Sequence, residues 1–291
     1  MDCTAQWPTI NGEDVTMTAS TPDLGSYETL ELDLTDGVLT LTVNRPHALN
    51  ALSQQVVSDL WKAFTAIQDS CTHDAGWPVR GVIVTGAGGK AFVAGADIRE
   101  MSSMDPDTAS AYGRSMHGVT LLIEKIPVPV IAAVDGFALG GGCELALACD
   151  FIYASEIAQF GQPEVNLGLV PGFGGSVRLP QRVGLGPARE LIYTGRRIDA
   201  AEALRLGLAN RVVPTRDDLF AAARATIGEI AAKAPLAVGL AKQSIAGATG
   251  RSTAKGLDIE ADAFREAFTT ADMREGTTAF LEKRKAVFAG K

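Results

Sequence analysis

The stretch IAAVDGFALGGGCELALACDFIYA (residues 131–154) places three consecutive glycines and a helix-forming segment between two apolar runs. The runs PVIAAVDG (129–136) and FIYAS (151–155) are short and continuous, as is typical of strands buried on both faces. Residues 143–149 between them favour a helix. A strand, a helix and a second strand in this order predict an α/β arrangement with parallel strand pairing.

The same alternation precedes this stretch. GVLTLTVN, starting at Gly37, alternates with the two-residue period of a half-buried strand, and GVIVTG (81–86) is another short apolar strand. Between these two strands, apolar residues recur at the spacing of a helix, at Leu52, Val56, Leu60, Phe64 and Ile67. The pattern extends the predicted α/β fold toward the N-terminus.

From about residue 185, Ala- and Leu-rich stretches bounded by Gly or Pro predict mainly helices, with one strand-like interruption at 209–213. We therefore predict an acidic mobile tail over residues 1–30, an α/β core over 31–215 and a C-terminal helical region over 216–291. Helices of this kind serve as a lid or as an oligomer contact, and composition does not choose between the two.

The formal net charge of −8 comes entirely from the eight acids that precede Arg45, because the remaining 247 residues carry 26 charges of each sign. A neutral body argues against nucleic-acid binding, which depends on neutralising phosphates. No apolar run reaches the 18 or so residues that span a bilayer, and the N-terminus resembles neither a secretory signal nor a transit peptide. We expect no membrane partner and a cytoplasmic location.

Cysteine and histidine usage offers little for metal or disulfide chemistry. The four cysteines are unevenly spaced, and none of the three histidines lies in a CxxC or HExxH context. We expect no metal site.

The glycines at 140–142 can aim several backbone N–H groups at one point, and a helix starting there adds its positive dipole end. The turn therefore suits an oxygen that carries negative charge. A dinucleotide fingerprint would need Gly or Ala where Leu145 stands, and a P-loop would need Ser or Thr where Ala91 stands. An oxyanion hole for an acyl carbonyl remains, alongside a tight turn that needs glycines only for close packing.

A second small-residue turn, in AFVAGADI (91–98), could supply another N–H donor near Ala96 if its strand neighbours the first in a parallel sheet. An ordinary turn is the alternative.

Glu144 and Glu164 are acids in apolar or Gly- and Pro-rich surroundings. Glu144 could simply favour a helix N-terminus, and Glu164 could be a solvated loop acid. If they face each other across a water-sized gap, their like charges would separate their proton affinities, so that one gives a proton and the other takes one. Serine hydrolase chemistry is excluded by the absence of a GxSxG motif.

The segment 131–154, followed by GQPEVNLGLVPGFGG (161–175), closely resembles the enoyl-CoA hydratase/isomerase (crotonase) family. NRPHALNAL (44–52), KAFVAGADIREM (90–101) and REGTTAFLEKRKAVF (274–288) are similar to it as well. The resemblance runs from about residue 37 to 288. It implies a crotonase-like α/β spiral of ββα units, followed by a helical C-terminal region used in trimer contacts, usually in a dimer of trimers.

The resemblance also implies a site. The thioester carbonyl would be held by the backbone N–H groups of Ala96 and Gly141, the catalytic acids would be Glu144 and Glu164, and Gly172 would help to place the water. Substrate-binding positions for the coenzyme A portion would be Ala48, Leu49, Ala96, Asp97, Ile98, Arg99, Phe280 and Lys283, the last two reaching a neighbouring subunit's ligand. His47 stands where a Lys is frequent and Asp135 where Asn is common.

The family hosts several reactions on an enoyl or acyl thioester. Hydration uses two carboxylates on one water, whereas double-bond isomerisation needs only the acid at the position of Glu164. The presence of both acids favours an enoyl-CoA hydratase acting on an acyl-CoA thioester, without any cofactor besides the coenzyme A of the substrate. An isomerase, a non-catalytic acyl-CoA-binding protein and a glycosidase are the alternatives. We expect a loop between Met101 and Met116 to set the preferred acyl length.

Overall fold

A computed structural model of the 291-residue chain describes residues 22–72 and 76–291. The strands in this part are β1 (Leu30–Thr35), β2 (Val38–Val43), β3 (Gly81–Gly86), β4 (Ala91–Val93), β5 (Val130–Val134), β6 (Phe137–Leu139), β7 (Phe151–Ser155), β8 (Gln159–Gly161), β9 (Arg197–Asp199) and β10 (Arg211–Val213). The helices are η1 (Pro46–Ala48), α1 (Gln54–Ser70), α2 (Ile98–Met101), α3 (Pro106–Lys125), α4 (Gly141–Leu147), η2 (Glu164–Leu167), α5 (Gly175–Val183), α6 (Leu185–Thr194), α7 (Ala200–Arg205), α8 (Arg216–Ala231), α9 (Pro235–Ala248), α10 (Thr253–Ala267) and α11 (Ala271–Glu282).

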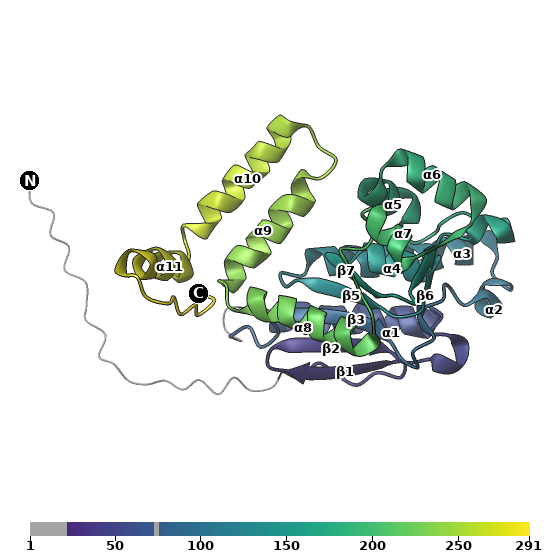
Figure 1. Cartoon of the computed structure of the whole chain (residues 1–291), viewed down its shortest axis with the longest axis horizontal. Coiled ribbons are helices and arrows are strands. Elements are labelled where there is room, and N and C mark those ends of the chain that lie inside the picture. Colours follow the sequence, from purple (N-terminus) through teal and green to yellow (C-terminus); the bar gives the residue numbers. More distant parts are fainter. Residues whose placement is uncertain (1–21, 73–75) are drawn as a thin grey trace, which may run out of the picture.

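The strands form two sheets, a larger one in the order β1-β2-β3-β5-β7-β10 and a smaller one in the order β4-β6-β8-β9. β2, β3, β5, β7 and β10 run parallel, and β1 and β9 add antiparallel edges. Each of the pairs β3–β4, β5–β6 and β7–β8 steps from the larger sheet to the smaller one and is followed by a helix (Figure 1). This repetition confirms the predicted spiral of ββα units and the predicted parallel pairing.

The larger sheet is covered on both faces, which explains why its strands are continuously apolar. Alternate strand residues such as Ile83 and Ile131 pack with Leu219 and Ile227 of α8, while Val82 and Val84 belong to the core cluster that includes α1 and α3. Because successive side chains of a strand point to opposite faces, the two clusters lie on opposite sides of this sheet.

Several element boundaries differ from the sequence-based expectations. The helix predicted at 143–149 begins at Gly141, since the glycine turn itself forms its first turn. β1 and β9 were not anticipated: β9 is a three-residue edge strand paired only with β8, whereas β1 (LELDLT) carries the two-residue alternation of a half-buried strand. Residues 1–21 of the predicted tail lie outside the described residues, and the predicted domain boundaries stay a prediction.

The prediction of a loop between Met101 and Met116 is wrong, since α3 starts at Pro106 and only residues 102–105 connect it to α2. Asp105 accepts a hydrogen bond from the backbone N–H of Thr108 at 2.7 Å, and proline is well suited to the first helical position. The segment has the helix-start signal Asp-Pro, and its apolar face buries Met116 against the core.

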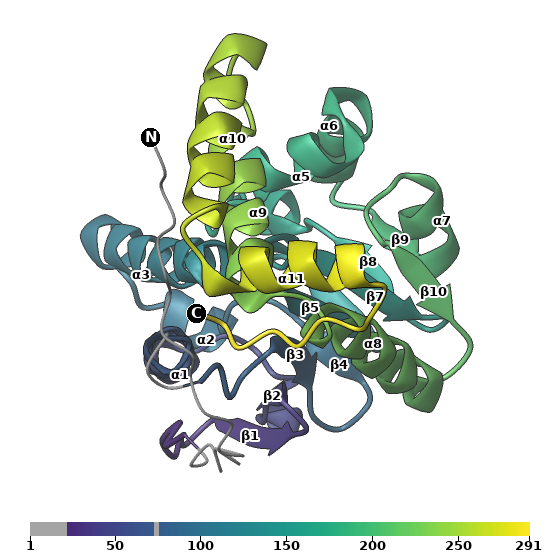
Figure 2. The ribbon, with the colours of Figure 1, turned by 90° about the vertical axis from the view of Figure 1, so that its left-hand side faces the viewer.

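The C-terminal helices form an antiparallel α9–α10 hairpin that leans away from the α/β body, with α11 beyond it (Figures 1 and 2). This confirms the predicted helical C-terminal region. Large apolar side chains remain exposed on α10 and α11, namely Leu257, Phe264, Phe268, Phe280 and Leu281. No helix within residues 22–72 and 76–291 combines the length and apolar character that crossing a membrane requires.

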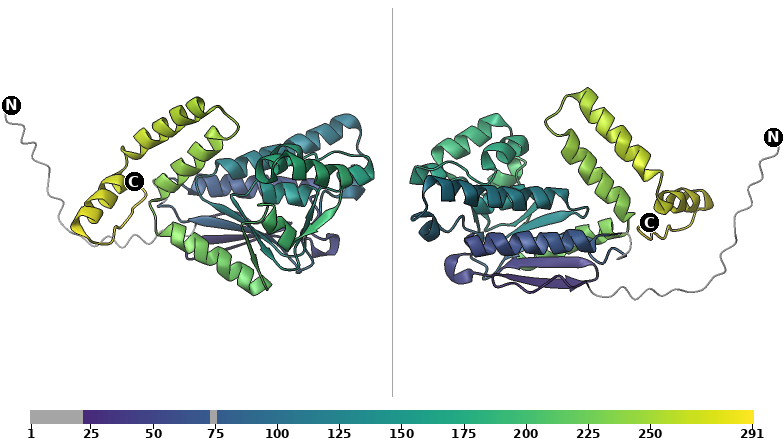
Figure 3. Two further views of the ribbon diagram at one scale, coloured as in Figure 1. Left: turned by 45° about the horizontal axis from the view of Figure 1, so that its top comes forward. Right: turned by 180° about the vertical axis from the view of Figure 1, so that it is seen from behind.

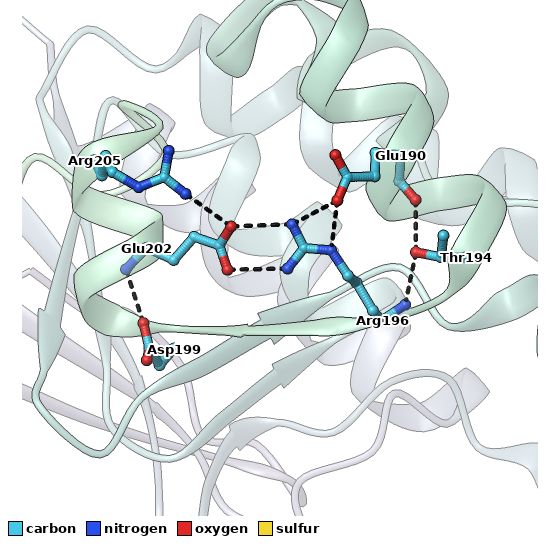
Figure 4. A network of polar contacts seen from close by, with 6 residues as sticks. All are labelled: Glu190, Thr194, Arg196, Asp199, Glu202 and Arg205. Carbon is cyan, nitrogen blue, oxygen red and sulfur yellow. Dashed lines mark hydrogen bonds and ion pairs between the residues drawn. The ribbon is translucent and has the colours of Figure 1, made fainter.

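A charged network fixes the turn between α6 and α7 (Figure 4). Arg196 bridges Glu190 and Glu202, with nitrogen–oxygen distances of 2.9 Å in both pairs. The adjacent Gly195 lies so close to Asn166 that a Cβ there would come within 2.8 Å of its Nδ2 atom. The network therefore stabilises the segment that packs against η2.

Lys242 connects α9 to the α/β body. Its largely buried ammonium group donates to the carbonyl oxygens of Ile123 and Val128 at 3.0 Å and to Asp150 Oδ2 at 2.8 Å. Three acceptors converge on this one cation.

Replacing Lys242 with Met should lower the free energy of unfolding by about 2 kcal/mol, because it leaves these acceptors without their donor. Chemical denaturation provides the measurement, with exposed Lys255→Met on α10 as the matched control. Equal stability of the two variants would contradict this role of Lys242.

Candidate active site

Two turns that follow neighbouring strands bring two backbone N–H groups together. β4 pairs in parallel with β6, with Val93 opposite Ala138, and Ala96 and Gly141 each lie three residues beyond this pair. Gly95 passes close to the end of β6, where a Cβ would lie 3.4 Å from the oxygen of Leu139. Parallel strands whose carboxyl ends meet thus place the two predicted donors at one edge of the smaller sheet.

Both N–H groups are available to a ligand. Gly141 is the first residue of α4, so its N–H has no partner within the helix. Across residues 22–72 and 76–291, neither Ala96 N nor Gly141 N takes part in a hydrogen bond. The oxyanion hole predicted from the sequence requires two such N–H groups without a partner in the protein, and it stays a prediction.

The glycine turn at 140–142 is required for close packing as well. A Cβ at Gly142 would lie 1.9 Å from the oxygen of Val93, and one at Gly141 would lie 2.7 Å from the ring of Phe173. Gly140 has φ 49° and ψ −122°, a conformation that favours glycine. The two interpretations of this turn are therefore compatible, since close packing is what leaves the N–H of Gly141 facing outward.

Two segments predicted to bind coenzyme A lie side by side. Leu52 N donates to Gly95 O at 2.8 Å, and Asp97 N donates to Leu52 O at 2.9 Å. Arg45 adds a two-pronged ion pair to Asp97 Oδ2 at 3.1 and 3.2 Å. These bonds hold residues 48–49 beside residues 96–99.

Glu144 is buried at the start of α4, and two backbone N–H groups hold its carboxylate. Phe173 N and Gly175 N donate to Oε1 at 2.8 and 2.7 Å. Burial raises the pKa of Glu144, and the two N–H groups act in the opposite direction by stabilising the charged form. The group is thus held in a fixed orientation while remaining able to exchange a proton.

Glu164 opens η2 and faces the same space. Burial, aided by the negative charge of Glu144, raises the pKa of Glu164 to about 7. With its NH₂ turned toward Glu164, Gln162 donates to Oε1 at 2.7 Å and to Oε2 at 3.1 Å. A Cβ at Gly175 would lie 3.0 Å from both Gln162 Cδ and Glu144 Oε1, so the amide lies between the two carboxylates.

A cavity of about 740 Å³ is lined by neighbours of this pair, although neither Glu144 nor Glu164 is among its lining residues. Phe173, whose N–H holds Glu144, lines it together with Gly172 and with Ile98 of α2. The rest of its apolar lining comes from Met101, Met104, Leu167 and Leu169. The cavity has the size and the mostly apolar character of a site for an organic ligand such as an acyl chain.

The structure does not bring every predicted site residue together. Phe280 and Lys283 belong to α11 and its C-terminal cap, at the end of the molecule opposite α2 (Figures 1 and 3). Within one chain they cannot contact the ligand that Ala96 would hold. Their predicted role therefore depends on a neighbouring subunit and stays a prediction.

Four residues of the site were missed by sequence analysis, namely Arg45, Tyr112, Gln162 and Phe173. Tyr112 donates to Leu52 O and packs edge-on against Phe173, with ring centroids 5.1 Å apart. Their roles arise from contacts between distant segments, for which a single sequence carries no local signal. Gln162 is the exception, because its position two residues before Glu164 in GQPE is a local signal.

Fold and site together define an α/β protein whose ββα spiral sets two backbone donors beside a pair of carboxylates. The sequence pattern of the family described as enoyl-CoA hydratase/isomerase matches residues 33–291, and the chain belongs to this family.

Named relatives and solved structures agree with this membership. The crotonyl-CoA hydratase of Syntrophomonas wolfei is 46% identical, over 91% of this chain and 100% of the relative. The short-chain-enoyl-CoA hydratase of Clostridium acetobutylicum is also 46% identical, over 85% and 92%. The crystal structure of an enoyl-CoA hydratase from Bacillus anthracis superposes with a TM-score of 0.85 at 40% identity, covering 91% of this chain and 100% of that one.

The two carboxylates should titrate as a coupled pair. We expect Glu164 to lose its proton near pH 7, and the Glu144→Gln variant to shift the pKa of Glu164 downward because it removes a like charge. The shift should be partial, since burial remains. Carbon NMR of labelled glutamate side chains measures both, and a wild-type Glu164 that titrates near 4.5 would contradict the arrangement.

Proposed function

We propose that this protein is an enoyl-CoA hydratase, which adds water reversibly across the 2,3 double bond of an enoyl-CoA thioester to give a 3-hydroxyacyl-CoA. The observation that carries the proposal is a pair of carboxylates with different environments beside two free backbone N–H donors. The hydratase names of relatives that are 46% identical support the same reaction.

The thioester carbonyl oxygen accepts hydrogen bonds from the N–H groups of Ala96 and Gly141. When a nucleophile attacks C3, negative charge moves onto this oxygen as an enolate forms. The two donors and the positive end of the α4 dipole stabilise that charge more strongly than they stabilise the neutral substrate. Each such donor contributes about 3 kcal/mol to the stability of a transition state.

Glu144 and Glu164 divide the proton transfers. Glu144, held by two N–H groups, takes a proton from the water that attacks C3, and Gly172 at the cavity wall helps to place this water. Glu164, whose pKa of about 7 keeps much of it protonated near neutral pH, delivers a proton to C2. Dehydration runs through the same groups with their proton states exchanged.

The coenzyme A portion lies along the two segments that Arg45 and the Leu52 bonds hold together. Ala48 and Leu49 contribute from one segment, and Asp97, Ile98 and Arg99 from the other. Phe280 and Lys283 act on the ligand of a neighbouring subunit, which requires the expected trimer or dimer of trimers. The exposed apolar residues of α10 and α11 support such an assembly. A cytoplasmic location also stays a prediction.

Isomerisation of the double bond is the alternative within the family. It moves one proton between carbons and can use Glu164 alone, so a buried second acid in contact with two N–H groups has no role in it. A non-catalytic acyl-CoA binder likewise has no use for two acids with separated proton affinities. Hydration uses both.

Glu144→Gln and Glu164→Gln should each lower kcat by a factor on the order of 10² to 10⁴ and leave KM nearly unchanged, because each removes a proton transfer and no binding contact. The loss of ultraviolet absorbance of crotonyl-CoA measures turnover, and product analysis separates hydration from isomerisation. Near-normal hydration by either variant would remove that acid from the mechanism.

Gly142→Ala should lower kcat by a factor of about 10², because its Cβ would push Val93 away and displace the donor at Gly141. Gly228→Ala is the matched control, since a Cβ there meets nothing within 4 Å and the residue lies in the last turn of α8. Comparable rates for the two variants would argue against the oxyanion hole.

A further inference from the structure

Arg178 lies behind the loop that holds Glu144. It belongs to the first turns of α5, and its side chain is 13% exposed. Its Nε atom donates to Glu124 Oε1 at 2.6 Å, and its Nη1 atom donates to the carbonyl oxygen of Phe173 at 3.3 Å. The guanidinium group therefore joins α3 to the residue whose N–H donates to Glu144.

The same guanidinium group packs directly on Gly174. A Cβ at this glycine would lie 2.1 Å from Nη1 of Arg178, and the residue has a φ of 114° that favours glycine. Gly174 stands between Phe173 and Gly175, the two donors to the Glu144 carboxylate. Any movement of the arginine would therefore change the geometry of both donors.

α3 contacts this loop at further points. A Cβ at Gly113 would lie 3.4 Å from the oxygen of Gly172, and Tyr112 packs edge-on against Phe173. Tyr112 and Gly113 also line the 740 Å³ cavity. The Arg178–Glu124 ion pair thus adds a polar contact to the packing of α3 against the loop 172–175.

The charges around Glu144 come from three elements. Arg178 on α5 lowers the pKa of Glu144, although burial raises it by more. Glu164 on η2 is the second acid, and the charge of Glu144 raises the pKa of Glu164. Glu124 on α3 lies behind the arginine and pairs with it. The neighbouring Cys143 on α4 has a raised pKa through burial and stays neutral. Arg178 is therefore the cation that favours the ionised form of Glu144.

We propose that Arg178, fixed by Glu124, is a positioning residue that holds the loop 172–175 and thereby keeps the Glu144 carboxylate oriented to take a proton from water. The inference rests on the proposed function, because it assigns the general base to Glu144. It adds a residue that does not line the cavity and that acts through the two N–H donors to Glu144.

The kinetic test compares Arg178→Met, Arg178→Lys and Glu124→Gln with wild type across the pH range on crotonyl-CoA. We expect Arg178→Met to lower kcat by a factor of about 10 or more while KM changes by less than about twofold. Loss of the positive charge should move the acid limb of the kcat profile upward by about one pH unit.

The conservative variants separate charge from geometry. Arg178→Lys should recover the position of the acid limb but only part of kcat, because an ammonium group cannot bond to Glu124 and Phe173 in the same fork geometry. Glu124→Gln should lower kcat less than Arg178→Met does. Arg224→Met is the matched control, since Arg224 on α8 pairs with the exposed Asp33 of β1 away from the site and should keep wild-type kinetics.

A second readout does not depend on turnover. Carbon NMR titration of Glu144 in wild type and Arg178→Met should show a higher pKa in the variant. If the wild type fails to hydrate crotonyl-CoA, the proposed function fails, and the titration still decides whether Arg178 controls Glu144. A folded Arg178→Met protein with wild-type kcat, acid limb and Glu144 titration overturns the inference. If that variant does not fold, Glu124→Gln decides by the same readouts.

Discussion

The carbonyl oxygen of Val93 and the α-carbon of Gly142 approach so closely that no side chain fits between them. This contact joins the end of β4 to the start of α4, and it aligns the turn at Gly95 with the turn at Gly140. The proposed oxyanion hole uses two N–H groups, of Ala96 and Gly141, that follow these neighbouring strand ends in different ββα units. Backbone donors fixed by packing need not reorganise as charge develops, which is the basis of electrostatic catalysis.

The acids of the site depend on the same packing. Glu144 follows the glycine turn directly, so the position of α4 also sets the position of its carboxylate. Burial of a carboxylate is unfavourable unless donors compensate for it, and the loop 172–175 supplies two of them. Burial and the negative charge of Glu144 raise the pKa of Glu164 to about 7. Two groups of one chemical type thus acquire different proton affinities from their surroundings.

Much of the fold could be predicted because its signals are local. The strands at 81–86 and 151–155 and the helix after residue 53 follow from hydrophobic periodicity, which reflects burial on one or both faces. The loop expected after Met101 proved to be mostly α3, although Asp105 and Pro106 form a recognisable helix start. β9 was missed because a three-residue edge strand depends on its partner for stability, and β1 was missed although LELDLT alternates with the period of a half-buried strand.

By itself the sequence determined the alternation of strands and helices in the centre of the fold, the glycine turn at 140–142 and the presence of two acids in apolar surroundings. Each of these follows from residue type and near neighbours along the chain. Only the tertiary structure decided that Gln162 stands between the acids, that Phe173 and Gly175 hold Glu144, and that Arg178 lies behind them. Contacts between residues far apart in sequence depend on how helices and sheets pack, and no local pattern of one sequence encodes them.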